Sequence, residues 1–139
     1  MKRSPSKPVV LCVDDDPMVL KSLSRLFREE PVQVVTTLQP QLALEWVQRR
    51  DVGLLLTDQR MPGMAGTDLV EEVQRCSPRT ACVILTGYAP DVAAQPSLLQ
   101  GVSGLISKPW DGPMLKSAVR QILHERRLEE EEDRRSSGE

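Results

Sequence analysis

The chain has 139 residues, of which 40% are hydrophobic and 27% charged, and its formal net charge is −2. This length suits one domain with its own core, and the near-neutral charge excludes a global field that attracts nucleic acid or an anionic membrane. No apolar run has the length of a membrane span. The apolar run after the basic start meets three aspartates, which excludes a signal peptide, and three cysteines without metal-ligand spacing fit a reducing cytoplasm.

In the first half of the chain, apolar runs predict strands at residues 8–13, 32–36 and 52–57. Residues 1–7 are expected to form a disordered basic lead-in. Asp16 and Pro17 are typical of a helix start, with aspartate as N-cap and proline as the first helical residue, and this helix is expected to run to about Glu30. A second helix is expected to open at Gln39–Pro40.

In the second half, strands are expected at residues 80–85 and 104–107, and a helix is expected at 67–76 after a loop rich in proline and glycine. The helix expected near residues 90–100 contains Pro96, which removes a hydrogen bond from a helix interior. We therefore expect this helix to be short, kinked or split. A last helix is expected after Asp111, which has the position of an N-cap.

Five strands that alternate with helices predict right-handed crossovers and a doubly wound α/β domain over residues 8–125. Residues 126–139 are expected to be a charged helical extension, a linker or a tail. Glu130–Arg134 and Glu131–Arg135 are i,i+4 pairs that support a helical stalk. Because the apolar periodicity fades after Leu123, a solvated, frayed tail is the favoured interpretation.

Each buried strand except the second is followed by, or ends in, a side chain with chemistry. Ligands bind outside the carboxyl ends of the strands in such sheets, so we expect these side chains to share one rim: Asp14, Asp15, Asp16, Asp58, Thr86 and Lys108. Adjacent ionised carboxylates need a compensating cation, and Mg²⁺ prefers carboxylate, water and phosphate oxygens. A carboxylate such as Asp58 acts as a nucleophile that forms an acyl phosphate, while a hydroxyl and an ammonium neutralise phosphoryl oxygens.

Four motifs in this order and spacing resemble the receiver (CheY-like) domain of bacterial two-component response regulators: VDDD, LLTDQRMPGMAG, ILTGY and SKPW. The resemblance implies a flavodoxin-like five-stranded parallel sheet in the order 2-1-3-4-5 with five helices. It implies that Asp58 takes a phosphoryl group from a sensor histidine kinase or a phosphotransfer protein. It further implies that Mg²⁺ (or Mn²⁺) is held by Asp14, Asp15, Asp58 and the main-chain carbonyl of Arg60, and that Thr86 and Lys108 contact the phosphoryl group.

Several positions around this site are expected to modulate it. Leu105 stands where receivers often carry an aromatic switch residue, and Gly87 is expected to keep the entrance to the site open. Arg60 and Tyr88 flank the phosphorylation site, at positions that in this family tune phosphoryl lifetime through the access of water. Trp110 follows Lys108 and Pro109 closely, so its fluorescence is expected to respond to Mg²⁺ or phosphorylation.

The expected function is a phosphorylation-controlled switch, with output through the face made by the fourth helix, the fifth strand and the fifth helix. That output is homodimerisation or control of a C-terminal effector absent from this chain. Such a receiver catalyses its own phosphorylation and dephosphorylation but turns over no substrate, and contacts neither nucleic acid nor membrane directly. The LTGY and KPWD variants are similar to receivers attached to cyclic-di-GMP phosphodiesterase modules or to enhancer-binding transcription regulators. The alternative is a pseudo-receiver, a protein-binding module that is never phosphorylated.

Overall fold

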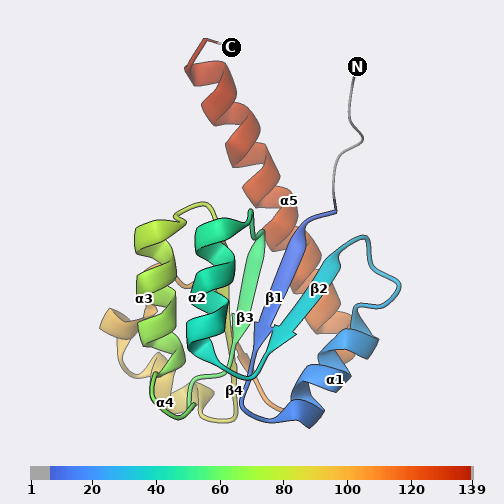
Figure 1. Ribbon diagram of the computed structural model, residues 1–139, viewed down its shortest axis with the longest axis vertical. Helices are drawn as coiled ribbons and strands as arrows, with labels where there is room; N and C mark the ends of the chain where they lie inside the picture. Colours follow the sequence, from blue (N-terminus) through green and yellow to red (C-terminus); the bar gives the residue numbers. More distant parts are fainter. Residues whose placement is uncertain (1–6, 139) are drawn as a thin grey trace.

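Five parallel strands form one sheet in the order β2-β1-β3-β4-β5 in the computed structural model, which describes residues 7–138 (Figure 1). The strands are β1 (Val9–Val13), β2 (Gln33–Thr37), β3 (Leu54–Thr57), β4 (Ala81–Thr86) and β5 (Gly104–Ser107). This order confirms the doubly wound, flavodoxin-like fold expected from the sequence. The lead-in expected at residues 1–7 lies, except for Lys7, outside the described residues.

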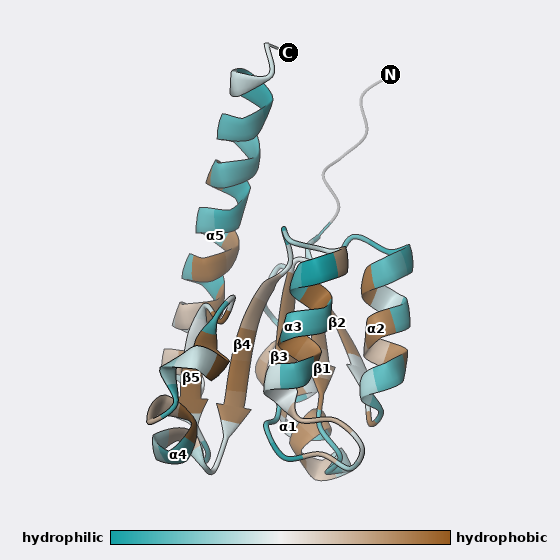
Figure 2. Cartoon of the chain, turned by 90° about the vertical axis from the view of Figure 1, so that its left-hand side faces the viewer, coloured by the Kyte–Doolittle hydropathy of each residue, from teal (hydrophilic) through white to brown (hydrophobic). Residues whose placement is uncertain are grey.

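Helices cover both faces of this sheet. One face carries α1 (Pro17–Leu26) and α5 (Gly112–Ser136), whose buried side chains include Leu23 and Leu115, and Phe27 just after α1 packs with them. The other carries α2 (Pro40–Arg49) and α3 (Gly66–Cys76). Figure 2 shows hydrophobic residues concentrated in the strands between these layers. None of the described helices has both the length and the apolar composition needed to cross a membrane.

The helix starts follow the expected capping chemistry. The Asp16 carboxylate accepts a hydrogen bond from the Met18 amide at 2.9 Å, and Asp111 accepts one from the Met114 amide at 3.4 Å. The end of α1 differs from the expectation, because the helix stops at Leu26 rather than near Glu30. Hydrogen bonds three residues apart tighten the chain there, from the amides of Arg28 and Glu30.

The region expected to hold an irregular fourth helix is split in two. A short α4 (Ala89–Ala93) is followed by the 3-10 helix η1 (Pro96–Leu99). Pro96 has no amide hydrogen to continue the α-helical pattern, and the chain turns through Gln95, whose amide bonds to the Val92 carbonyl at 3.0 Å. The expectation of a short, kinked or split helix is therefore confirmed, and the structure shows a short helix and a split.

The segment after residue 125 is helical, so the expectation of a frayed tail was wrong. The α5 helix continues to Ser136 and projects beyond the edge of the sheet where the strands begin (Figures 1 and 2). Arg126 anchors it: its guanidinium donates to the Arg79 carbonyl at 2.7 Å and pairs with Asp51 at 2.9 Å and with Glu130 at 3.2 Å. A second contact joins Arg79 to Asp133 at 3.2 Å. The contacts with Arg79 and Asp51 therefore join the extension to the domain body.

Candidate functional site

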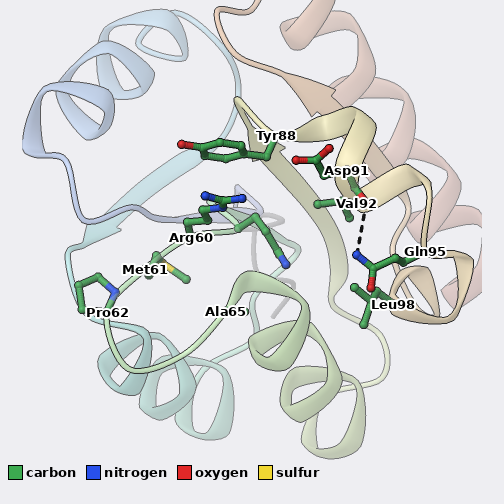
Figure 3. A pocket seen from close by; sticks show the side chains of 10 residues that line it. Arg60, Met61, Pro62, Ala65, Tyr88, Asp91, Val92, Gln95 and Leu98 are labelled. Carbon is green, nitrogen blue, oxygen red and sulfur yellow. Dashed lines mark hydrogen bonds between the residues drawn. The ribbon is translucent and has the colours of Figure 1, made fainter.

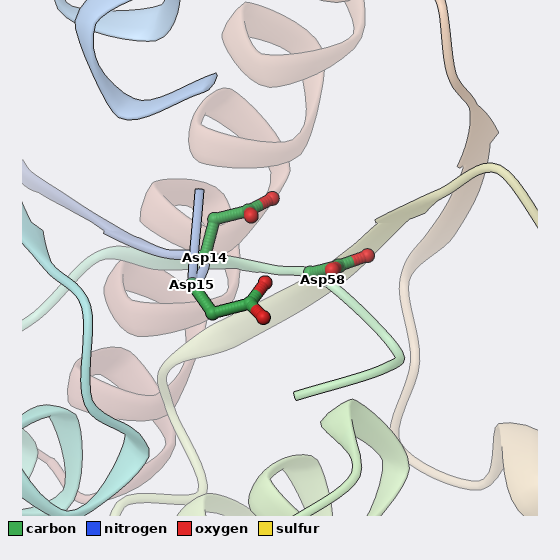
Figure 4. A group of neighbouring side chains, drawn as sticks. All are labelled: Asp14, Asp15 and Asp58. Carbon is green, nitrogen blue, oxygen red and sulfur yellow. The ribbon is translucent and has the colours of Figure 1, made fainter. Parts of the chain in front are cut away.

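Parallel pairing brings three aspartates together at the carboxyl ends of β1 and β3. Val13 lies opposite Thr57 in the sheet, so the residues that follow them, Asp14 and Asp58, leave the sheet side by side. Asp14 and Asp58 are buried, whereas Asp15 is exposed. Each of the three offers a carboxylate oxygen, and these oxygens lie within 4.8 Å of one another (Figure 4). The strand ends thus form an acidic cluster open to solvent on the Asp15 side.

Lys108, which follows β5, reaches across the rim to this cluster. Its ammonium lies 2.7 Å from an Asp14 carboxylate oxygen and 3.4 Å from one of Asp58. Burial opposes the protonated form of this lysine, but the two carboxylates outweigh it and raise the pKa of Lys108. The side chain is therefore a fixed positive charge at the site over the physiological pH range.

The surroundings of Asp58 disfavour its ionised form. Burial, and then the charge of Asp14, raise the pKa of Asp58, although Lys108 and the Gln59 amide act in the opposite direction. The Gln59 amide donates to the Asp58 carboxylate at 2.9 Å, and the Asp16 amide donates to Asp14 at 2.9 Å. A cluster that one lysine does not fully neutralise, and that offers only carboxylate oxygens, has the donor set that a hard divalent cation such as Mg²⁺ prefers.

Thr86 and Gly87 form the wall of the site contributed by β4. The Thr86 side chain is fully buried, and its hydroxyl oxygen accepts a hydrogen bond from the Tyr88 amide at 3.1 Å. A hydroxyl that accepts one bond still has its own hydrogen to donate. Apart from Gly87 and its two chain neighbours, no heavy atom lies within 4 Å of the place that a side chain at Gly87 would occupy, so the approach beside Thr86 is open.

Arg60 and Tyr88 meet across the mouth of the site. The Arg60 guanidinium lies 3.6 Å from the centre of the Tyr88 ring, a cation–π contact (Figure 3). Both residues line a cleft of about 530 Å³ between the loop after β3 and α4. The two positions that the sequence predicted to modulate the site therefore form one stacked pair.

The other two positions predicted to modulate the site, Leu105 and Trp110, pack against the core on opposite faces of the sheet. Leu105 in β5 is half-buried against the α2–α3 side of the sheet. Trp110 is half-buried on the opposite side, with α1 and α5. The Lys108–Pro109 peptide bond between them is cis, a conformation that bonds before proline tolerate.

Gln59 is a residue at the site that our sequence reasoning did not single out. Its side-chain oxygen accepts from the Thr67 amide at 3.0 Å, and its side-chain nitrogen donates to the Thr67 hydroxyl at 3.2 Å. Its main-chain carbonyl accepts from the Gly66 amide at 2.8 Å. The partners are seven and eight residues away across a loop, and no periodic pattern points to such a contact.

Comparison with known proteins gives a consistent result. The profile of the response regulator receiver domain family matches residues 10–120. The transcriptional regulatory protein GlrR of Escherichia coli K12 is 36% identical over 118 residues, which cover 84% of this chain and 26% of GlrR. The chain thus corresponds to only part of that relative.

Two solved structures show the same fold. The signal receiver domain of an HD domain-containing protein from Pseudomonas fluorescens Pf-5 superposes with a TM-score of 0.84 at 27% identity, covering 94% of this chain and 97% of that one. A CheY-like response regulator receiver domain from Methanospirillum hungatei JF-1 gives a TM-score of 0.82 at 28% identity, covering 89% of this chain and 99% of that one.

Proposed function

This chain belongs to the response regulator receiver domain family, and we propose that it is a switch controlled by phosphorylation of Asp58. The observation that supports this role best is the convergence on Asp58 of two further carboxylates within 4.8 Å and of the Lys108 ammonium at 3.4 Å. A buried carboxylate with this surrounding charge has the parts that phosphoryl transfer needs, which are a nucleophile and groups that neutralise the transferred oxygens.

The proposed reaction transfers a phosphoryl group from a phosphohistidine to Asp58. The bond between phosphorus and the histidine nitrogen breaks, its electron pair stays on the histidine, and an Asp58 oxygen forms the new bond to phosphorus. Lys108 neutralises one of the phosphoryl oxygens, and the Thr86 hydroxyl donates to another. Hydrolysis then returns the carboxylate and releases inorganic phosphate, so the domain catalyses its own modification without turning over a substrate.

The carboxylates fit Mg²⁺, or Mn²⁺ in its place, and Asp14, Asp15 and Asp58 would hold it with the main-chain carbonyl of Arg60. When bound, the cation supplies charge neutralisation for the incoming phosphoryl oxygens. Lys108 already supplies part of this charge neutralisation, because its ammonium bridges Asp14 and Asp58.

We further propose that a sensor histidine kinase or a phosphotransfer protein donates the group, and that the reaction takes place in the cytoplasm. Phosphorylation adds about −1.5 to −2 charge, which shifts the population toward the conformer that binds this charge better. The output face is α4, β5 and α5, acting through homodimerisation or through a C-terminal effector. GlrR is named a transcriptional regulatory protein and the Pseudomonas receiver belongs to an HD domain-containing protein, so either effector class suits the extended α5.

The test is the intact mass of the full chain after incubation with acetyl phosphate, with and without Mg²⁺. We expect one phosphoryl adduct on the wild type in the presence of Mg²⁺ and none on Asp58→Asn, which keeps the hydrogen bond from the Gln59 amide. An adduct on Asp58→Asn at the wild-type rate would refute the assignment of Asp58. No adduct from either acetyl phosphate or a panel of phosphorylated histidine kinases would refute the switch and favour a protein-binding pseudo-receiver.

A further inference from the structure

We propose that Gln59 is a positioning residue that closes the loop after the phosphoacceptor and thereby sets the geometry of the metal site. The inference rests on the proposed function for the identity of the site, and it assigns a role to a side chain that touches neither the phosphoryl group nor the cation. Its basis is the set of four hydrogen bonds that Gln59 makes with Asp58, Gly66 and Thr67.

The start of α3 has no capping side chain at its N-cap. The first amides of a helix have no partner within the helix, and Ala65 at the N-cap has no oxygen in its side chain. Gln59 takes over this role from outside, because its main-chain carbonyl accepts from Gly66 at 2.8 Å and its side-chain oxygen accepts from Thr67 at 3.0 Å. The start of α3 is therefore held by the residue next to the phosphoacceptor.

This arrangement brings Gly66, at the start of α3, into close contact with Asp58. A methyl group on Gly66 would overlap the carbonyl oxygen of Asp58 and lie only 3.0 Å from its carbonyl carbon. The first residue of α3 thus packs directly against the peptide of Asp58. A shift of the helix start is transmitted to that peptide without any intervening flexible group.

A loop connects Gln59 to the residues of α3 that it binds. Residues 60–65 leave Gln59 and return to the residues that Gln59 binds, so Gln59 ties both ends of the loop. Arg60 is the first residue of the loop, and its carbonyl is the one expected to contact the cation. Ligands are held in place by the contacts around them, and loss of such outer contacts costs about 10- to 100-fold in metal affinity in well-studied sites. Loss of the side-chain carboxamide of Gln59 would leave the Arg60 carbonyl free to move.

The experiment compares the full-length wild type with Gln59→Leu, which is close in size but makes no side-chain hydrogen bond. Gln74→Leu is the matched control, since the Gln74 side chain donates to the Thr80 carbonyl at 3.0 Å from later in the same helix, away from the site. Mg²⁺ affinity is read from the rise in melting temperature with Mg²⁺ concentration. The rate of amide hydrogen exchange at Thr67 without metal measures directly whether the Gln59 side chain still binds the start of α3.

We expect Gln59→Leu to bind Mg²⁺ about tenfold more weakly and to exchange the Thr67 amide faster, while Gln74→Leu binds Mg²⁺ like the wild type. Equal affinity in Gln59→Leu and the wild type, an equal loss in both variants, or no Mg²⁺ binding by the wild type would overturn the proposal. Labelling with acetyl phosphate separates the role of Gln59 from the proposed function. If the wild type is not labelled but Gln59→Leu still binds Mg²⁺ more weakly than the wild type and Gln74→Leu, the phosphorylation role is refuted and the positioning role of Gln59 stands.

Discussion

Replacement of Gly66 by alanine tests whether α3 really begins against the peptide of Asp58. The added methyl group would overlap the Asp58 carbonyl oxygen and lie 3.0 Å from its carbonyl carbon and 3.1 Å from the Gln59 Cα. Carbon atoms in good contact are about 3.5–4.0 Å apart. All three neighbours are main-chain atoms, so they have no rotamer change with which to relieve the overlap.

The magnitude follows from what must move. Overpacking of this kind costs about 1–3 kcal/mol, and displacing the helix start weakens the 2.8 Å hydrogen bond from the Gly66 amide to Gln59, worth about 1 kcal/mol. Alanine regains at most about 1 kcal/mol through its better helix propensity. The last two contributions roughly cancel, so we expect Gly66→Ala to lower the free energy of unfolding by about 1–3 kcal/mol.

The assay is urea unfolding followed by tryptophan fluorescence and circular dichroism on the full chain. Gly87→Ala is the matched control, because the space beside Gly87 is open, and its free energy of unfolding should stay within about 0.5 kcal/mol of the wild type. If Gly66→Ala proved as stable as Gly87→Ala, the close approach of α3 to Asp58 would be wrong, and the proposed role of Gln59 would lose its structural basis.

Three further predictions use other parts of the molecule. Because burial and Asp14 raise the pKa of Asp58, the stability that this group contributes is present below the ordinary value of 3.8 and is lost as pH rises through the raised pKa. Without Mg²⁺, Asp58→Asn should therefore unfold at a higher urea concentration than the wild type at pH 7, with the gap closing as the pH falls through the raised pKa of Asp58 towards 3.8; a gap independent of pH would contradict this. Arg126→Leu should lower the free energy of unfolding by about 2 kcal/mol, because the charged hydrogen bonds of Arg126 to the domain body are lost. The same substitution should speed amide exchange across residues 127–136. The exposed Arg127→Leu should do neither. Burial raises the pKa of Cys12 to about 12 and that of Cys82 to about 11, so a thiol reagent should modify only the exposed Cys76 in the native protein; rapid modification of a second thiol would show that the core opens.

The rim of the site was accessible to sequence reasoning because each of its residues ends an apolar run. Chain order and the handedness of parallel crossovers place such strand ends on one edge of the sheet. The apolar runs alone therefore predict that Asp14, Asp58, Thr86 and Lys108 meet at this edge. The split of the fourth helix was equally accessible, since Pro96 acts on its own backbone.

Other features depend on pairs of residues that local patterns do not connect. The stacking of Arg60 on Tyr88 joins two loops that follow different strands. The α5 extension was misjudged because its stability comes from Arg126, whose partner Asp51 lies 75 positions away in the chain. Local apolar periodicity reports how a helix buries its own face, and it carries no information about a distant carboxylate or carbonyl.

By itself, the sequence determined the sheet, the edge where the chemistry lies and the residue types gathered there, because strand periodicity, caps and proline act over a few neighbouring residues. Only the tertiary structure decided how that chemistry is held: Gln59 across the loop to Thr67, Gly66 against the Asp58 peptide, and Lys108 between two carboxylates. Those contacts depend on distances of a few ångströms between segments far apart in the chain, and such distances exist only once the whole domain has packed.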